Sequence, residues 1–200
     1  MLLFLKKLKN GLFFLFLLSV LLAFNAPRVS ILVVVAMLVH EGGHALVLLL
    51  LGKSVRGIRF GAVGAKMSYS GRLSYREECL VCIAGPVANL LVGGLVFLCL
   101  HNKNEYFCLF SYVNFFYALT NLLPLPSYDG EKILRILTFH LPYPKVAEHI
   151  LSLISLLLRC VLLFLSLYLI FYFDIAYQIF GCIFFSLLPD FAKEHFSSKK

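Results

Sequence analysis

The chain has 200 residues, of which 61% are hydrophobic and 14% charged, and 20 of them are Phe. Soluble domains are about 45–50% apolar and about 25% charged, so this composition excludes a soluble globular domain and a disordered chain. The remaining class is a polytopic membrane protein whose surface is solvated by lipid. The formal net charge of +8 does not indicate nucleic-acid binding, because basic residues in short loops set membrane orientation.

Six apolar stretches are candidate membrane-spanning helices, each of which needs about 20 apolar residues. The first follows Lys6, Lys7 and Lys9. It has the basic start of a signal peptide, but Ala26 ends a poor cleavage site, and we interpret it as a retained span. We therefore predict an all-α polytopic membrane protein with six transmembrane helices, at residues 11–26, 29–51, 79–100, 106–123, within 150–173, and 175–188.

The basic residues are distributed asymmetrically along these stretches. With a cytoplasmic N-terminus, 15 of the 18 Lys and Arg residues fall in cytoplasmic segments, and only Arg28 and Lys103 lie on the opposite side. Because cytoplasmic loops carry the excess of Lys and Arg, this pattern predicts that both termini are cytoplasmic. Arg159 interrupts the fifth stretch, where it can snorkel, pair with a carboxylate or mark a bend.

Segment 55–74, between the second and third spans, is rich in glycine and too broken for a helix. It predicts short β-strands with turns at the cytoplasmic face. A plain basic loop is the alternative. If strands form, an exposed strand edge can pair with an extended peptide.

The second span contains the sequence His40-Glu41-Gly42-Gly43-His44. Residues four apart share one helix face, so the two imidazoles can bind one metal ion while Glu41 acts as a base on water. A charged group at the centre of a membrane helix costs about 2.5–3.5 kcal/mol, so such residues need a partner or a function. The alternative is a polar cluster satisfied by neighbouring helices, with the two glycines permitting close packing.

A catalytic zinc ion takes three protein ligands and keeps one position open. The best candidate for the third ligand is Asp129, at the end of a segment in which Pro124, Pro126 and Gly130 break the fourth helix. Non-helical backbone at membrane depth is tolerated only where it is buried in protein or lines a wet cavity. The alternative for Asp129 is an Asp-Gly turn at the membrane surface.

Three motifs together resemble those of the site-2 protease family of intramembrane zinc metalloproteases. They are HExxH at residues 40–44, Ala-Gly-Pro-Val-Ala-Asn at residues 84–89 and NxxPxxxxDG at residues 121–130. The resemblance covers about residues 29–137, the expected catalytic core. It implies one zinc ion per chain bound by His40, His44 and Asp129, with Glu41 as the catalytic base. It also implies that Asn89 and Asn121 line the site and help to position the substrate.

Six spans without a PDZ insertion are most similar to the compact bacterial branch typified by the stage IV sporulation protease FB. We expect a single domain over residues 1–200 in the bacterial cytoplasmic membrane, with no C-terminal nucleotide-binding domain. The resemblance implies hydrolysis of peptide bonds in or near the transmembrane segments of membrane-associated substrates, as in regulated intramembrane proteolysis. The expected partners are the lipid bilayer, such a substrate and, as an option, a regulatory membrane protein, but no nucleic acid.

Other interpretations stay open. Glu77 or Glu78 is a second candidate for the third zinc ligand, as in other membrane zinc proteases. Cys79 and Cys82 have CxxC spacing, which can indicate zinc or redox chemistry, but the sequence offers no second pair or nearby His. Outside enzymes, the alternatives are a pseudoprotease that binds membrane helices without cutting them, and a transporter whose broken helices form an ion site.

Overall fold

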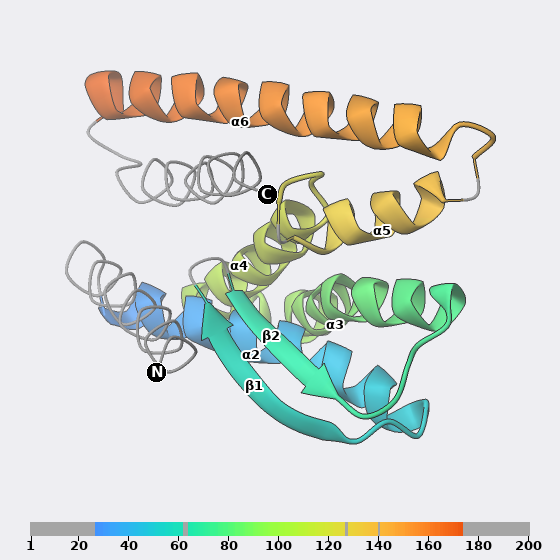
Figure 1. Ribbon diagram of the computed structural model, residues 1–200. Helices are drawn as coiled ribbons and strands as arrows, with labels where there is room; N and C mark the ends of the chain where they lie inside the picture. Colours follow the sequence, from blue (N-terminus) through green and yellow to red (C-terminus); the bar gives the residue numbers. More distant parts are fainter. Residues whose placement is uncertain (1–26, 62–63, 127, 140, 174–200) are drawn as a thin grey trace, which may run out of the picture.

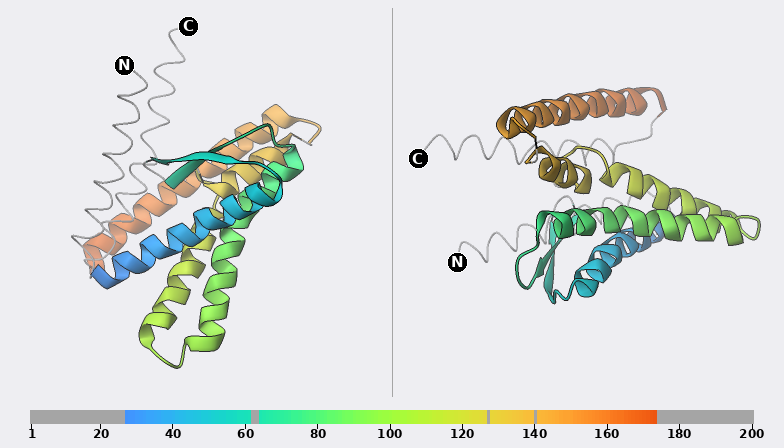
Figure 2. Two further views of the ribbon diagram at one scale, coloured as in Figure 1. Left: turned by 90° about the horizontal axis from the view of Figure 1, so that it is seen from below. Right: turned by 90° about the vertical axis from the view of Figure 1, so that its right-hand side faces the viewer.

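The structure is a computed structural model that describes residues 27–61, 64–126, 128–139 and 141–173 (Figure 1). The elements, in chain order, are α2 (Pro27–Leu50), β1 (Val55–Gly61), β2 (Gly64–Tyr69), α3 (Tyr75–Leu100), α4 (Glu105–Asn121), α5 (Asp129–Thr138) and α6 (Pro144–Phe173). Helix α3 packs against α2, α4 and α5, and α6 lies on the other side of α5 (Figures 1 and 2).

Three of the described helices are long and apolar enough to cross a membrane: Val29–Leu50, Tyr75–Leu100 and Pro144–Leu165. They correspond to the second, third and fifth predicted spans. Helix α4 matches the fourth prediction in position, but with 17 residues it is shorter than the other three. The predicted first and sixth spans, residues 11–26 and 175–188, lie outside the described residues, so the count of six is not confirmed.

The burial pattern of these helices is that of a chain surrounded by lipid. Large apolar side chains such as Leu50, Leu98 and Phe164 are exposed, each at 74–76% of its full accessibility. The buried positions include many small or polar residues: Ser30, Ala36, His40, Asn89, Ser111, Asn114 and Ala118. Soluble proteins show the reverse preference, and polar groups between membrane helices must find partners there.

Helix α3 begins four residues earlier than predicted because its first turn is capped. The Ser74 hydroxyl accepts a hydrogen bond from the backbone N–H of Glu77 at 3.4 Å, and the Glu77 carboxylate accepts one from the backbone N–H of Ser74 at 2.7 Å. This reciprocal pair satisfies two backbone donors that the helix itself leaves unpaired. The cap extends α3 beyond its apolar stretch.

The strands predicted within 55–74 are present as an antiparallel hairpin, with Ile58 opposite Met67 and Phe60 opposite Ala65. Gly52 and Gly71 flank it with φ angles of 70° and 77°, in the left-handed region that glycine adopts without steric cost. Both strands contact α2. The plain-loop alternative is therefore wrong.

Small residues let α2 and α3 approach closely. A Cβ atom added to Gly43 would lie 2.5 Å from the Ala84 carbonyl oxygen and 2.7 Å from the Ala88 Cβ. A Cβ atom added to the neighbouring Gly42 would have no other atom within 4 Å. Of the two glycines in the HExxH motif, Gly43 is thus the one that makes the close helix packing possible.

Helix α6 runs without interruption through Arg159, so the structure does not support a bend, one of the three alternatives for this residue. The Arg159 side chain is 6% exposed, and its Nε donates a hydrogen bond to the Ser155 carbonyl oxygen at 3.3 Å.

Candidate metal centre

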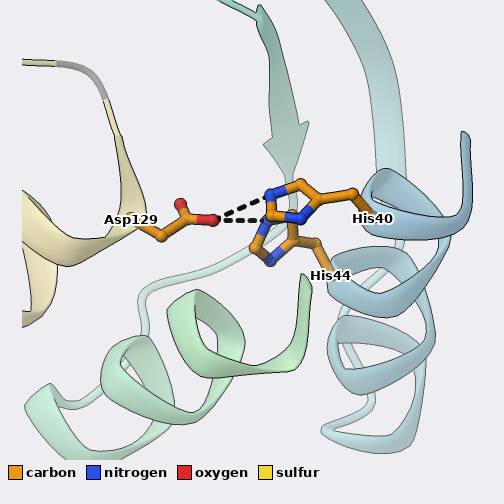
Figure 3. Close-up of side chains that lie close together, drawn as sticks. All are labelled: His40, His44 and Asp129. Carbon is orange, nitrogen blue, oxygen red and sulfur yellow. Dashed lines mark hydrogen bonds and ion pairs between the residues drawn. The ribbon is translucent and has the colours of Figure 1, made fainter. Parts of the chain in front are cut away.

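The two motif histidines project from one face of α2. His40 and His44 lie one turn apart, and their rings are perpendicular, with centroids 4.7 Å apart (Figure 3). The His40 side chain is 3% exposed and that of His44 is 12% exposed. The predicted helical spacing thus brings both imidazoles to one buried point.

Asp129 reaches this point from the first residue of α5. Helix α4 ends at Asn121, and the chain turns back before α5 begins, which confirms the predicted break at the prolines. A Cβ at Gly130 would overlap the backbone carbonyl of Leu122, so this turn requires glycine. The N-terminus of a helix carries a partial positive charge, which stabilises a carboxylate there.

The three side chains converge within hydrogen-bonding distance. Asp129 Oδ2 lies 3.0 Å from Nε2 of His40 and 3.0 Å from Nε2 of His44, and the two Nε2 atoms are 3.2 Å apart (Figure 3). Among the described residues, this is the group of three His, Cys, Asp or Glu side chains spaced to hold a metal ion. Neither Glu77 nor Glu78 belongs to it.

The outward nitrogen of each ring already has an acceptor. Nδ1 of His44 donates to the Val81 carbonyl oxygen at 2.6 Å, and Nδ1 of His40 donates to Asn89 Oδ1 at 2.9 Å. A neutral imidazole has a single N–H, which both rings use outward. When both rings are neutral, three lone pairs therefore face one another, and a metal ion among them, or a proton on one Nε2, relieves their repulsion.

Helix α3 forms one wall of the site through Gly85. A Cβ atom on this residue would lie 2.5 Å from Nε2 of His44 and 2.8 Å from Cε1 of His40. Glu41 follows His40 on α2, is half-buried, and lies close enough to both histidines and Asp129 to interact with them electrostatically. The site therefore combines three converging ligand-type atoms with a neighbouring carboxylate.

Lys132 is a site residue that the sequence analysis missed. Its Nζ donates to Asp129 Oδ1 at 2.7 Å, from one turn further along α5. Burial raises the pKa of the Asp129 carboxyl, and the charge of Lys132 acts in the opposite direction and favours the ionised form. The spacing of three residues between Asp129 and Lys132 was the available signal.

The two predicted substrate-binding asparagines lie in different surroundings. Asn89 is fully buried behind His40, and both hydrogens of its amide are donated, to Ala36 and to Asn114. It therefore presents no donor to a substrate in this structure. Asn121 is half-buried at the end of α4 and donates to the Tyr117 carbonyl oxygen at 2.9 Å.

The two cysteines of the CxxC spacing lie in the first turns of α3 as free thiols, and Cys82 is buried. The described part of the chain places no His, Asp or Glu with them as a metal-type cluster.

The chain is similar in fold and in sequence to known proteins. A site-2 protease from Methanocaldococcus jannaschii has a similar fold, with a TM-score of 0.66 and 22% identity over 88% of this chain and 86% of that chain. A protein of the same organism, provisionally named a zinc metalloprotease, is 32% identical over 89 residues, which are 42% of this chain and 47% of that protein. The chain thus spans about half the length of this curated relative.

The family model described as Peptidase M50B-like matches residues 12–176. This match includes all three motifs and every described element from α2 to α6. Together with the apolar helices it identifies an integral membrane protein. The chain therefore belongs to the Peptidase M50B-like family.

Proposed function

We propose that the chain is an intramembrane zinc metalloendopeptidase that hydrolyses peptide bonds in or near the transmembrane segments of membrane-associated proteins. The observation that carries this proposal is the convergence of two Nε2 lone pairs and one carboxylate oxygen, 3.0–3.2 Å apart, in a buried site. Family membership supports the same conclusion.

The donor set suits zinc. Two imidazole nitrogens and one carboxylate oxygen are a ligand set of catalytic zinc sites, which keep a fourth position open. Ligand atoms about 2.0–2.1 Å from a tetrahedral ion lie roughly 3.3 Å from one another, close to the distances between His40, His44 and Asp129. The outward hydrogen bonds at both Nδ1 atoms support the tautomer that a metal ligand needs.

In this proposal the chain's own groups divide the work of hydrolysis. Zinc, when bound, supplies Lewis-acid polarisation of the scissile carbonyl and lowers the pKa of water to about 7. Glu41 serves as the general base, taking a proton from the attacking water and passing it to the leaving amine. Lys132 holds one oxygen of Asp129 and leaves the other for the metal. Asn121, at the end of α4, is the remaining candidate for holding the substrate backbone.

The surroundings of the site bear on the substrate. A membrane-spanning helix has to unwind before its backbone reaches a catalytic centre, and the unpaired edge of a two-stranded sheet can hold an extended segment. We place this role on the β1–β2 hairpin. The proposal also places the chain in a bacterial cytoplasmic membrane with both termini in the cytoplasm. It includes a regulatory membrane protein as a partner.

Elemental analysis of the detergent-purified chain tests the metal site. The parent is expected to hold one zinc ion per chain, Asp129→Ala to lose most of it, and Glu41→Gln to retain it. Cleavage is then measured after reconstitution into vesicles with a tagged single-span test polypeptide. The parent is expected to cleave this polypeptide. The Glu41→Gln variant and the chelator-treated parent are expected to leave it intact.

Each result has a clear consequence. A well-folded parent without zinc overturns the protease in favour of a binding or transport role. Zinc without cleavage of any single-span polypeptide favours a pseudoprotease. Full zinc content in Asp129→Ala refutes Asp129 as the third ligand while leaving the enzyme assignment intact.

A further inference from the structure

Two fully buried asparagines connect His40 to the fourth helix. Asn89 in α3 accepts a hydrogen bond from Nδ1 of His40 at 2.9 Å, and its amide donates to Asn114 Oδ1 in α4 at 2.8 Å. Asn114 in turn donates to the Phe110 carbonyl oxygen at 2.9 Å. Both asparagines have 0% exposure. A continuous line of hydrogen bonds thus runs from α4 through α3 to the metal centre on α2.

Backbone carbonyls determine which atom donates and which accepts in each of these hydrogen bonds. The Phe110 carbonyl can only accept, so the Asn114 atom facing it is Nδ2, and Oδ1 of Asn114 faces Asn89. Asn89 also faces the carbonyl of Ala36 at 2.9 Å, which again can only accept. Nδ2 of Asn89 therefore points to both acceptors, and its Oδ1 points to His40.

This direction determines where the proton of His40 lies. Because Oδ1 of Asn89 has no hydrogen to give, Nδ1 of His40 has to carry the proton, and Nε2 keeps its lone pair. We infer that Asn114, acting through Asn89, is a positioning residue that holds His40 in the tautomer that binds the metal. The inference rests on the proposed function.

The two histidines are held by different means. Nδ1 of His44 donates to the backbone carbonyl of Val81, which no side-chain substitution can remove directly. Of the two Nδ1 atoms, that of His40 is the one held by a side chain. Gly93 supports this arrangement, because its missing side chain leaves α4 room to bring Asn114 up to α3: a Cβ there would lie 3.1 Å from the Asn114 Cβ.

Buried amides in membrane helices can also act simply as adhesive contacts between helices. Adhesion alone would affect the stability of the bundle. Adhesion would not make the effect of an Asn114 substitution on zinc affinity depend on whether Asn89 is present. The metal affinity of a double mutant therefore distinguishes the two roles.

The experiment measures the zinc dissociation constant of the full chain in detergent by competition with a chelator. We expect Asn89→Leu to weaken binding about 10–100-fold, as outer-shell substitutions commonly do, and Asn114→Leu about tenfold. In the double variant, Asn114→Leu is expected to add nothing further, because a link that is already broken cannot be broken again. Thermal unfolding of the metal-free proteins reports stability separately.

Two further variants test the chemistry of the link. In Asn114→Asp, the carboxyl keeps the size of the amide and keeps an oxygen that accepts the hydrogen bond from Asn89, whether or not it is protonated. It should therefore bind zinc within about threefold of the parent. Ser111→Ala is the matched control, because Ser111 is a buried polar residue on the same helix that donates only to the Phe107 carbonyl. It should leave zinc affinity unchanged.

The outcomes separate the inference from the proposed function. A folded parent that binds no zinc overturns both. Parent-like affinity in Asn114→Leu, or additive effects in the double variant, overturns the inference alone, as does an Asn114→Asp variant no better than Asn114→Leu. If Asn114→Leu does not accumulate as folded protein, Asn114→Ala removes the same acceptor without added bulk, and the same results decide.

Discussion

The main chain of Gly85 in α3 lies directly against the imidazole of His44 in α2, so that a Cβ atom there would be 2.5 Å from Nε2. This nitrogen is one of the three atoms that converge on the metal centre. A methyl group at Gly85 would therefore occupy space at the ligand atom itself. The nearest atoms belong to packed rings rather than to the ends of flexible side chains, so the clash is not easily relieved.

We predict that Gly85→Ala strongly reduces zinc content and abolishes proteolysis. The matched control is Gly94→Ala on the same helix, where a Cβ meets nothing within 4 Å. Replacing glycine by alanine in an open helical position is mildly stabilising, by about 0.5–1 kcal/mol. Zinc per chain and thermal unfolding are measured for both. Normal zinc content in Gly85→Ala would show that the rings can move aside.

The crossing of α2 and α3 gives a second prediction, which concerns stability. Gly43→Ala introduces a methyl group 2.5 Å from the Ala84 carbonyl oxygen, and overpacking of this kind typically costs about 1–3 kcal/mol. Gly42→Ala is the control, because the adjacent position is open. We expect a lower unfolding temperature in detergent for Gly43→Ala than for Gly42→Ala. Equal temperatures would mean that the helices separate without cost.

The parts of the site that sequence could predict are those with local geometry. The i, i+4 spacing of His40 and His44 needs only a helix to bring both rings to one face. The prolines before Asp129 predict the helix break that lets this residue turn back toward α2. The glycines of segment 55–74 exclude a helix and leave strands as the regular alternative.

The partners of Asn89 could not be predicted in the same way. Whether its amide faces a substrate or the back of His40 depends on how α3 crosses α2 and α4, and no sequence spacing sets those crossings. The resemblance to a family suggested contact with substrate, whereas the structure has both amide hydrogens donated inside the bundle. The start of α3 is a different case: the apolar stretch begins four residues later, at Cys79, and the spacing Ser74-x-x-Glu77 is the sequence signal for the cap that extends the helix.

Lys132 provides a third prediction. Its ammonium group holds Asp129 Oδ1 at 2.7 Å, but its side chain is 46% exposed. Solvent therefore screens this ion pair and reduces its contribution to zinc binding. We expect Lys132→Met to weaken zinc binding by about threefold to tenfold, between the effects of exposed pairs and of buried charged hydrogen bonds.

Arg135→Gln is the control for Lys132→Met. It removes one positive charge from the same helix, where Arg135 pairs with Glu131 and not with Asp129. Chelator competition is again the measurement. If both variants lose affinity equally, the general positive charge of α5 matters and the contact with Asp129 does not.

The β1–β2 hairpin provides the last prediction, which separates catalysis from substrate handling. Its strands pair with each other, and within the described residues no third strand joins the sheet. Each strand therefore has an outer edge whose backbone groups are able to pair with an extended segment. The hairpin contributes none of the three side chains that converge on the metal centre.

We predict that deleting residues 57–71 abolishes cleavage of a single-span polypeptide in vesicles while one zinc ion per chain is retained. A second variant replaces the same residues by a Gly-Ser segment of equal length, which keeps the connection between α2 and α3 but forms no ladder. Both are expected to be inactive and loaded with zinc. Cleavage at the parent's rate by either variant would contradict the role of the hairpin, and loss of zinc would show that it supports the metal centre instead. The metal content thus determines which of the two roles a loss of cleavage reflects.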